Sequence, residues 1–163
     1  MKYYLHAGGI SVESVIQILD FVQNNDGDLT IGMNSGGGQT SAAAFLLDCL
    51  NANSERVTLT ALTGIYSAAF WLFYNFKGKR KIASGCRGMF HYATQPVTLC
   101  ATGRPDGFED EAIVSALKHD KIANEKIALE FMNPTELKKF KKNWDVFFGF
   151  DRMMEIFPDA QII

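Results

Sequence analysis

The sequence predicts an α/β fold with a mostly parallel β-sheet built from β-α-β units. Short β-type runs alternate with segments whose apolar residues recur at helical spacing, from Lys2 to Phe76. A glycine cluster, Gly36 to Gly38, separates one of these runs from the helical segment that follows it. Of the 163 residues 47% are hydrophobic, which is enough to bury the core of a single domain spanning residues 1–163.

The first half of the chain is expected to contain three strands and three helices. The strands are predicted at residues 2–6, 29–33 and 56–62. The helices are predicted at residues 11–25, 40–50 and 67–76. Ser11 can cap the first helix. The third helix is apolar on every side, so it must be buried.

The second half is predicted to hold two short strands around a turn, "KGKRKIASG" and "RGMFHYAT", before a loop at 95–107 that carries prolines and glycines. The longest helix is expected from Glu109 to Met132. Asn133-Pro134 stops this helix and caps a short one, because proline is tolerated in a first turn. The last segment, residues 151–163, reads as helical.

Composition excludes several classes of partner. There are 16 Lys and Arg against 18 Asp and Glu, so the net charge of −2 indicates neither a nucleic acid nor an anionic membrane surface. The longest apolar run, residues 67–76, is too short to cross a bilayer, and the start "MKYYLHAGG" lacks a signal-peptide core. We therefore expect a soluble protein of the cytoplasm.

Cysteine usage indicates neither a disulfide framework nor a zinc site. The three cysteines, Cys49, Cys86 and Cys100, lack CxxC or Cys/His metal spacing. We interpret them as buried thiols and expect no metal and no cofactor.

The glycine cluster allows two interpretations. Unpaired amides before a helix can hold a phosphate, but Gly-Lys-Ser/Thr, GxGxxG and a ribose-binding acid are all absent from this stretch. The same bare backbone can direct an amide at the oxyanion of an acyl-transfer intermediate when a nucleophile lies near.

A candidate nucleophile lies in "TGIYSAAFWLF". Here a strand turns at Gly64 and enters an apolar helix near Ser67, which would expose the hydroxyl beside a helical amide. The candidate base is His91, at the end of the β-type run "GMFH". His6 and His119 are poorer candidates, since the first lies in the opening strand and the second on a polar helix face.

The segments "MNSGGG", "GIYSAAF", "KGKR", "GMFH" and "DVFFGFDRM" resemble, in this order, the proteolytic subunit of the Clp protease. The resemblance covers essentially the whole chain. It implies the α/β superhelix that this family shares with crotonases, with a long handle-type helix. It also implies serine endopeptidase activity on peptides or unfolded chains inside stacked rings of identical subunits.

The resemblance assigns roles to particular residues. It makes Ser67 the nucleophile, His91 the general base and Asp145 the acid that orients the base, with Asp151 and Asp120 as alternatives for the acid. It places the oxyanion hole at the backbone amides of Gly38 and Ala68. It also lets Gly36 and Gly37 pair with the backbone of an extended substrate.

Several positions depart from the family pattern. Gly36 replaces a proline, Ala68 a common methionine, and Tyr66 a small residue just before the serine. The resemblance allows a AAA+ unfoldase as a partner, but the family segments that contact it precede the first strand, where this chain begins, so docking to a AAA+ partner is not expected. The helix 109–132 is expected to join two rings. Its candidate contacts are Ile113, Ala116, Leu117, Ala123 and Ile127.

Two other functions are compatible with the sequence. One is a catalytically silent relative that serves as a structural or scaffold subunit, which Tyr66 favours. The other is an acyl-CoA enzyme of crotonase architecture, which needs an oxyanion hole but no serine. No carboxylate pair suited to hydration chemistry is evident for the latter.

Overall fold

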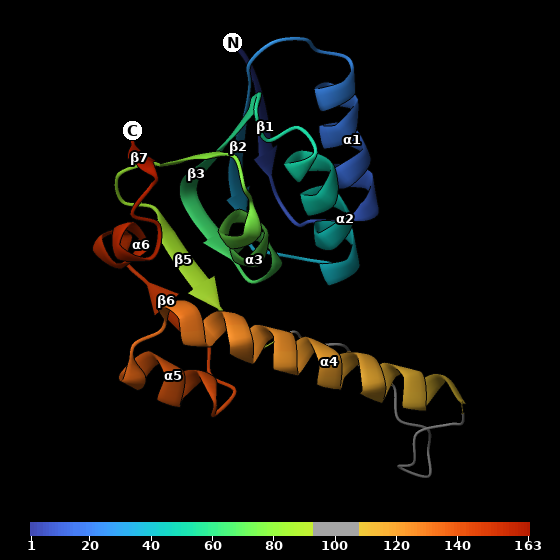
Figure 1. Cartoon of the computed structure of the whole chain (residues 1–163), viewed down its shortest axis with the longest axis vertical. Helices are drawn as coiled ribbons and strands as arrows, with labels where there is room; N and C mark the ends of the chain where they lie inside the picture. Colours follow the sequence, from blue (N-terminus) through green and yellow to red (C-terminus); the bar gives the residue numbers. More distant parts are fainter. Residues whose placement is uncertain (93–107) are drawn as a thin grey trace. The chain divides into compact units, whose positions relative to one another are not determined.

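The computed structural model describes residues 1–92 and 108–163, with the side chains of 108–118 and 120 left out (Figure 1). The chain divides into two compact units. We call Met1–Phe90 with Val146–Ile163 the sheet unit, and His91–Asp145 the helical unit. Cys100 and the predicted loop at 95–107 lie outside the described residues. The expectation of a single domain stays a prediction.

The sheet unit contains a seven-stranded, mostly parallel sheet, which confirms the predicted fold class. The strands are β1 (Lys2–Ala7), β2 (Leu29–Ser35), β3 (Val57–Tyr66), β4 (Lys79–Ile82), β5 (Arg87–Phe90), β6 (Val146–Phe148) and β7 (Gln161–Ile162). The main order is β1-β2-β3-β4-β7, and β5 pairs with the far end of β3. Only the β5–β6 pair is antiparallel among the described strands.

Helices pack against this sheet where the apolar spacing predicted them (Figure 1). They are α1 (Val12–Gln23), α2 (Thr40–Asn51), α3 (Ala68–Asn75) and α6 (Phe150–Ile156). Ser11 caps α1 as expected, because its side chain accepts from the Ser14 amide while Ser14 Oγ accepts from the Ser11 amide. The predicted cap of α1 is thus confirmed.

Phenylalanines form the centre of the sheet unit. Phe70 of α3 is fully buried, and its ring lies 5.4 to 5.7 Å from the rings of Phe90, Phe148 and Phe157. These partners come from β5, β6 and the segment after α6. The apolar third helix therefore holds together segments that are distant in sequence, because its aromatic side chains bury large areas.

The structure corrects two predicted boundaries. The strand expected at 56–62 continues to Tyr66, with a register shift against β2 between Met33 and Ser35. The helix expected over 151–163 is wrong in its second half. It ends at Ile156, Pro158 follows, and Gln161–Ile162 form β7 beside β4. Proline cannot donate a backbone hydrogen bond, which favours ending the helix there.

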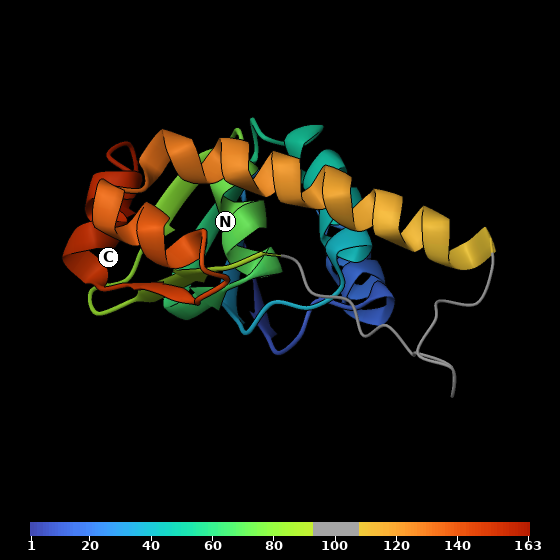
Figure 2. The same cartoon turned by 90° about the horizontal axis from the view of Figure 1, so that it is seen from below.

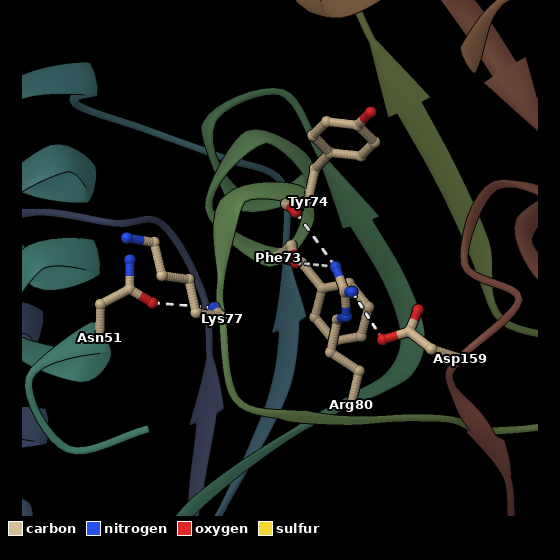
Figure 3. Close-up of polar contacts among 6 residues, drawn as sticks. All are labelled: Asn51, Phe73, Tyr74, Lys77, Arg80 and Asp159. Carbon is tan, nitrogen blue, oxygen red and sulfur yellow. Dashed lines mark hydrogen bonds and ion pairs between the residues drawn. The ribbon is translucent and has the colours of Figure 1, made fainter. Parts of the chain in front are cut away.

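Arg80 of β4 holds the C-terminal segment through Asp159 (Figure 3). Its guanidinium donates to the carbonyls of Phe73 and Tyr74, forms a 2.7 Å ion pair with Asp159, and lies over the Phe157 ring. The "KGKR" segment, which lies in a strand predicted from the sequence, therefore also anchors the C-terminal segment. Beside it lies a polar cavity of about 330 Å³ lined in part by Lys77, Lys79 and Glu55.

His6 makes the stability of the sheet unit sensitive to acid. Its side chain is 5% exposed, and its Nε2 atom has no hydrogen-bond partner among the described residues. Burial lowers the pKa of His6, and a backbone contact with Gly8 offsets this only in part. The unfolded chain therefore takes up a proton below about pH 6.5 that the folded chain resists, so stability is full above this pH and falls below it.

We expect His6→Asn to weaken this acid sensitivity. Between pH 7.5 and 5.5 the Tm of the variant should fall less than that of the wild type, whose slope for one proton is at most about 1.4 kcal/mol per pH unit. Thermal melts at both pH values provide the measurement. His119→Asn is the control, because His119 is exposed. Equal declines in the wild type and His6→Asn would contradict the assignment.

The helical unit contains α4 (Phe108–Phe131) and α5 (Pro134–Phe140). The long helix predicted at 109–132 is confirmed within one residue at each end, and it is unbroken in both views (Figures 1 and 2). Asn133 caps α5 as expected, because its side chain accepts from the amides of Thr135 and Glu136.

Candidate active site

Ser67 lies at a sharp turn between β3 and α3 in the sheet unit. Its backbone has φ 55° and ψ −125°, a conformation that L-residues rarely adopt outside strained functional turns. The Ser67 amide donates to the Met89 carbonyl of β5, and its carbonyl accepts from Trp71 in the first turn of α3. The Ser67 hydroxyl makes no capping hydrogen bond to α3.

This turn matches the geometry of a nucleophile elbow, in which strain exposes a hydroxyl at the start of a helix. Of the residues with positive φ among those described, only Ser67 and Asn143 are not glycine. Strain of this kind costs on the order of 1–3 kcal/mol, so the surrounding contacts must hold it in place. The sequence motif "GIYSAAF" indicated a serine here but not its backbone conformation.

Gly37 is the glycine that approaches the serine most closely. An added Cβ at Gly37 would lie 2.6 Å from Ser67 Cβ, 2.8 Å from the Tyr66 carbonyl oxygen and 3.1 Å from the Ala68 amide nitrogen. Its φ of 97° also disfavours any other residue. Sequence reasoning assigned Gly37 only to substrate pairing and missed this contact, because the approach of β2 to β3 is not visible in a sequence.

Gly38 lies against the chain that leads into α1. An added Cβ would lie 2.2 Å from the Ile10 carbonyl oxygen, and Gly38 pairs with Ile10 in a parallel bridge. In this pairing Ile10 bonds to the carbonyl of Gly37 and to the amide of Gln39, so the Gly38 amide takes no part in it. The Gly37 amide instead donates to Ser35 Oγ. Gly36 has open space around it.

Ala68 is the first residue of α3 and is 4% exposed. The N–H groups of a first helical turn have no intrahelical acceptor, so they are available to an anion. The sheet unit therefore brings Gly37, Ser67 and the Ala68 amide together, with Gly38 next to them in the chain.

Tyr66 lies beside the serine without occupying its turn. An added Cβ at Gly64 would lie 2.6 Å from the Tyr66 ring, so the ring folds back along β3 over this glycine. The Tyr66 ring also lies edge-on to the Phe147 ring, with 6.4 Å between ring centroids. The bulky residue found before Ser67 is thus accommodated by a glycine two positions earlier.

His91 and Asp145 come together in the helical unit. His91 directly follows β5 and Asp145 directly precedes β6, strands that end in the antiparallel pair Phe90–Val146. The distance from His91 Nδ1 to Asp145 Oδ1 is 3.5 Å, and the two side chains are 23% and 52% exposed. A carboxylate at Nδ1 leaves Nε2 as the atom that can take a proton from a nucleophile.

The other candidate acids differ in position. Asp151 lies in the first turn of α6, where a carboxylate favours the helix dipole. The side chain of Asp120 lies outside the described residues. Among the three acids, the described contact to His91 is that of Asp145.

The structure describes two of the three cysteines. Cys86 is buried, as expected, and burial raises the pKa of its thiol to about 11, while Cys49 is half-buried.

No cluster of three or more His, Cys, Asp or Glu that could hold a metal occurs in the described part of the chain. No helix within the described residues is long and apolar enough to span a membrane.

The protein is an α/β protein that contains a serine at a strained turn, a glycine loop beside this turn, and a His–Asp pair. The family profile for Clp protease matches residues 7–134, which include Ser67 and His91. The chain therefore belongs to the Clp protease family. A search of curated proteins found no match.

Proposed function

We propose that this protein is a serine endopeptidase of the Clp type, which cleaves peptides or unfolded chains inside an oligomeric ring. Ser67 attacks the scissile carbonyl, His91 takes its proton, and Asp145 orients the imidazole. The observation that carries the proposal is the strained turn at Ser67, whose hydroxyl makes no capping hydrogen bond to α3.

The proposed reaction follows from these groups. His91 Nε2 removes the Ser67 proton as the hydroxyl attacks, and the imidazolium then protonates the leaving amine. The amides of Gly38 and Ala68 stabilise the oxyanion, each with an effect on the order of 2.7–4 kcal/mol. Water enters the same site and releases the acyl group, with His91 again acting as base. The glycine loop leaves room for an extended substrate backbone.

We expect a fluorophosphonate probe to label Ser67 in the assembled protein, because only an activated serine reacts readily. Ser67→Ala and His91→Ala should abolish labelling. Ser41→Ala is the matched control and should leave labelling unchanged, since Ser41 is an exposed serine in the first turn of α2. Mass spectrometry of the labelled peptide identifies the modified residue.

Two variants test which carboxylate is the third member of the proposed triad. Asp145→Asn should slow labelling at least about 100-fold, because the amide favours the wrong tautomer of His91. Asp151→Asn should leave the rate unchanged. The reverse result would assign the role to Asp151.

The silent-subunit alternative makes the opposite prediction. If the chain is a structural subunit, rings should form and the probe should not label them at any pH between 6 and 9. Such a result would overturn the peptidase proposal.

Ring assembly is supported by an exposed apolar surface on α4. Ile122 and Leu129 are 67% and 62% exposed, and they lie one heptad apart on a helix long enough to contact another subunit. Of the predicted contacts, Ala123 is exposed and Ile127 half-buried. The side chains of Ile113, Ala116 and Leu117 lie outside the described residues. Light scattering of the purified chain would measure the number of subunits.

A further inference from the structure

Tyr92, the residue after His91, is held by contacts from both helices of the helical unit. Its hydroxyl donates a 2.8 Å hydrogen bond to Glu125 Oε1 of α4. Its ring stacks on Phe140 of α5, with 4.1 Å between centroids and 29° between planes. The Lys121 ammonium lies 5.6 Å from the centre of the Tyr92 ring. No family motif identified in the sequence includes Tyr92.

These contacts use the inner face of α4. Lys121, Glu125 and Ala128 recur at helical spacing, as does Met132 just after the helix, and Ala128 and Met132 are buried. The exposed Ile122 and Leu129 lie three residues before and four residues after Glu125, so they border this face on its exposed side. One helix therefore presents an exposed apolar surface next to the attachment for the residue after His91.

The stacked rings also join the two segments that carry the His–Asp pair. Phe140 is fully buried and ends α5. After it the chain turns, with the Asn143 amide bonded to the Phe140 carbonyl and the Trp144 amide bonded to the Lys139 carbonyl. Asp145 follows immediately. The Tyr92–Phe140 stack thus restrains the chain one residue after His91 and a few residues before Asp145.

The hydrogen bond from the Tyr92 hydroxyl to Glu125 persists throughout the pH range in which a histidine acts as a base. Burial, together with the hydrogen bond and the charge of Glu125, raises the pKa of Tyr92 above its ordinary value. The phenol therefore keeps its proton and remains a donor to the Glu125 carboxylate.

We propose that Tyr92 is a positioning residue that holds His91 against Asp145 and links this pair to helix α4 through Glu125. The inference rests on the proposed function, in which His91 is the base. A displacement of α4, such as docking on the exposed apolar surface at Ile122 and Leu129, is transmitted through Glu125 and Tyr92 to the imidazole.

The experiment combines peptide hydrolysis with NMR titration of the His91 ring in the full-length protein. Tyr92→Phe retains the stacked ring and removes the hydroxyl, and Glu125→Ala removes the acceptor. Each should lower kcat about tenfold with KM unchanged, and the double variant should be no worse than either single one. Glu125→Gln keeps an acceptor oxygen and should restore most of kcat.

The control is Tyr4→Phe, which removes a tyrosine hydroxyl from an exposed contact with Gln17 and should change nothing. The His91 titration is recorded in a Ser67→Ala background, so it reports on Tyr92 even if the chain has no peptidase activity. Tyr92→Phe and Glu125→Ala should shift the His91 midpoint alike. An unchanged midpoint in both variants, with circular dichroism showing an intact fold, would overturn the inference.

Discussion

Gly37→Ala is expected to reduce fluorophosphonate labelling of Ser67 at least about 100-fold, because the new methyl group would collide with the turn at Ser67, the proposed nucleophile. The added carbon would lie 2.6 Å from Ser67 Cβ, and the nearby backbone atoms of Tyr66 and Ala68 cannot move aside as a flexible side chain could. The φ of 97° adds strain that an alanine cannot relieve. The turn should shift and carry the hydroxyl and the Ala68 amide out of alignment.

Gly36→Ala is the matched control for this prediction. The two glycines are neighbours in the same loop, but an added carbon at Gly36 meets no atom within 4 Å, and Gly36 is not among the residues of positive φ. Its labelling rate should stay within about twofold of the wild type. Equal losses in the two variants would show that the loop tolerates no added bulk anywhere, which contradicts a specific contact between Gly37 and Ser67.

Phe70→Ala should give the largest loss of stability, about 3–5 kcal/mol in the free energy of unfolding. The ring is fully buried among Phe90, Phe148 and Phe157, and its removal leaves a cavity between rings from three separate segments. For a chain of this length the Tm should fall by roughly 6–20 °C. Melts must be compared at one protein concentration, because assembly stabilises the folded subunit.

Phe147→Ala is the comparison for this variant. Phe147 is 67% exposed, and its described aromatic contact is the edge-on one with Tyr66. Its removal should cost about 1 kcal/mol or less. A similar Tm for both variants would mean that the Phe70 cluster does not form the centre of the sheet unit.

Local patterns in the sequence predicted the elements whose signals are local. Ser11 and Asn133 cap their helices because a short polar side chain can reach the amides of the next turn. The end of β3 and the small strand β7 were not predicted, because both depend on neighbours far away in sequence. Tyr66 pairs with Met89, and Gln161 pairs with Lys81.

The candidate site shows the same division. The residue types and their order, together with the resemblance to the Clp subunit, predict Ser67, His91 and Asp145 as nucleophile, base and orienting acid, and these roles stay proposals. The closeness of Gly37 to Ser67 and the attachment of Tyr92 to Glu125 could not be predicted. Both contacts join segments that only the folded backbone brings together.

The sequence by itself determined the α/β class and the position of most helices and strands, and it supplied the residues proposed for peptide hydrolysis, because apolar periodicity, capping residues and functional groups are properties of short segments. The tertiary structure decided the strained conformation of Ser67, the fit of the bare glycine beside it, and the 3.5 Å approach of Asp145 to His91. These depend on strand pairing and helix packing between distant residues, whose geometry no local pattern specifies.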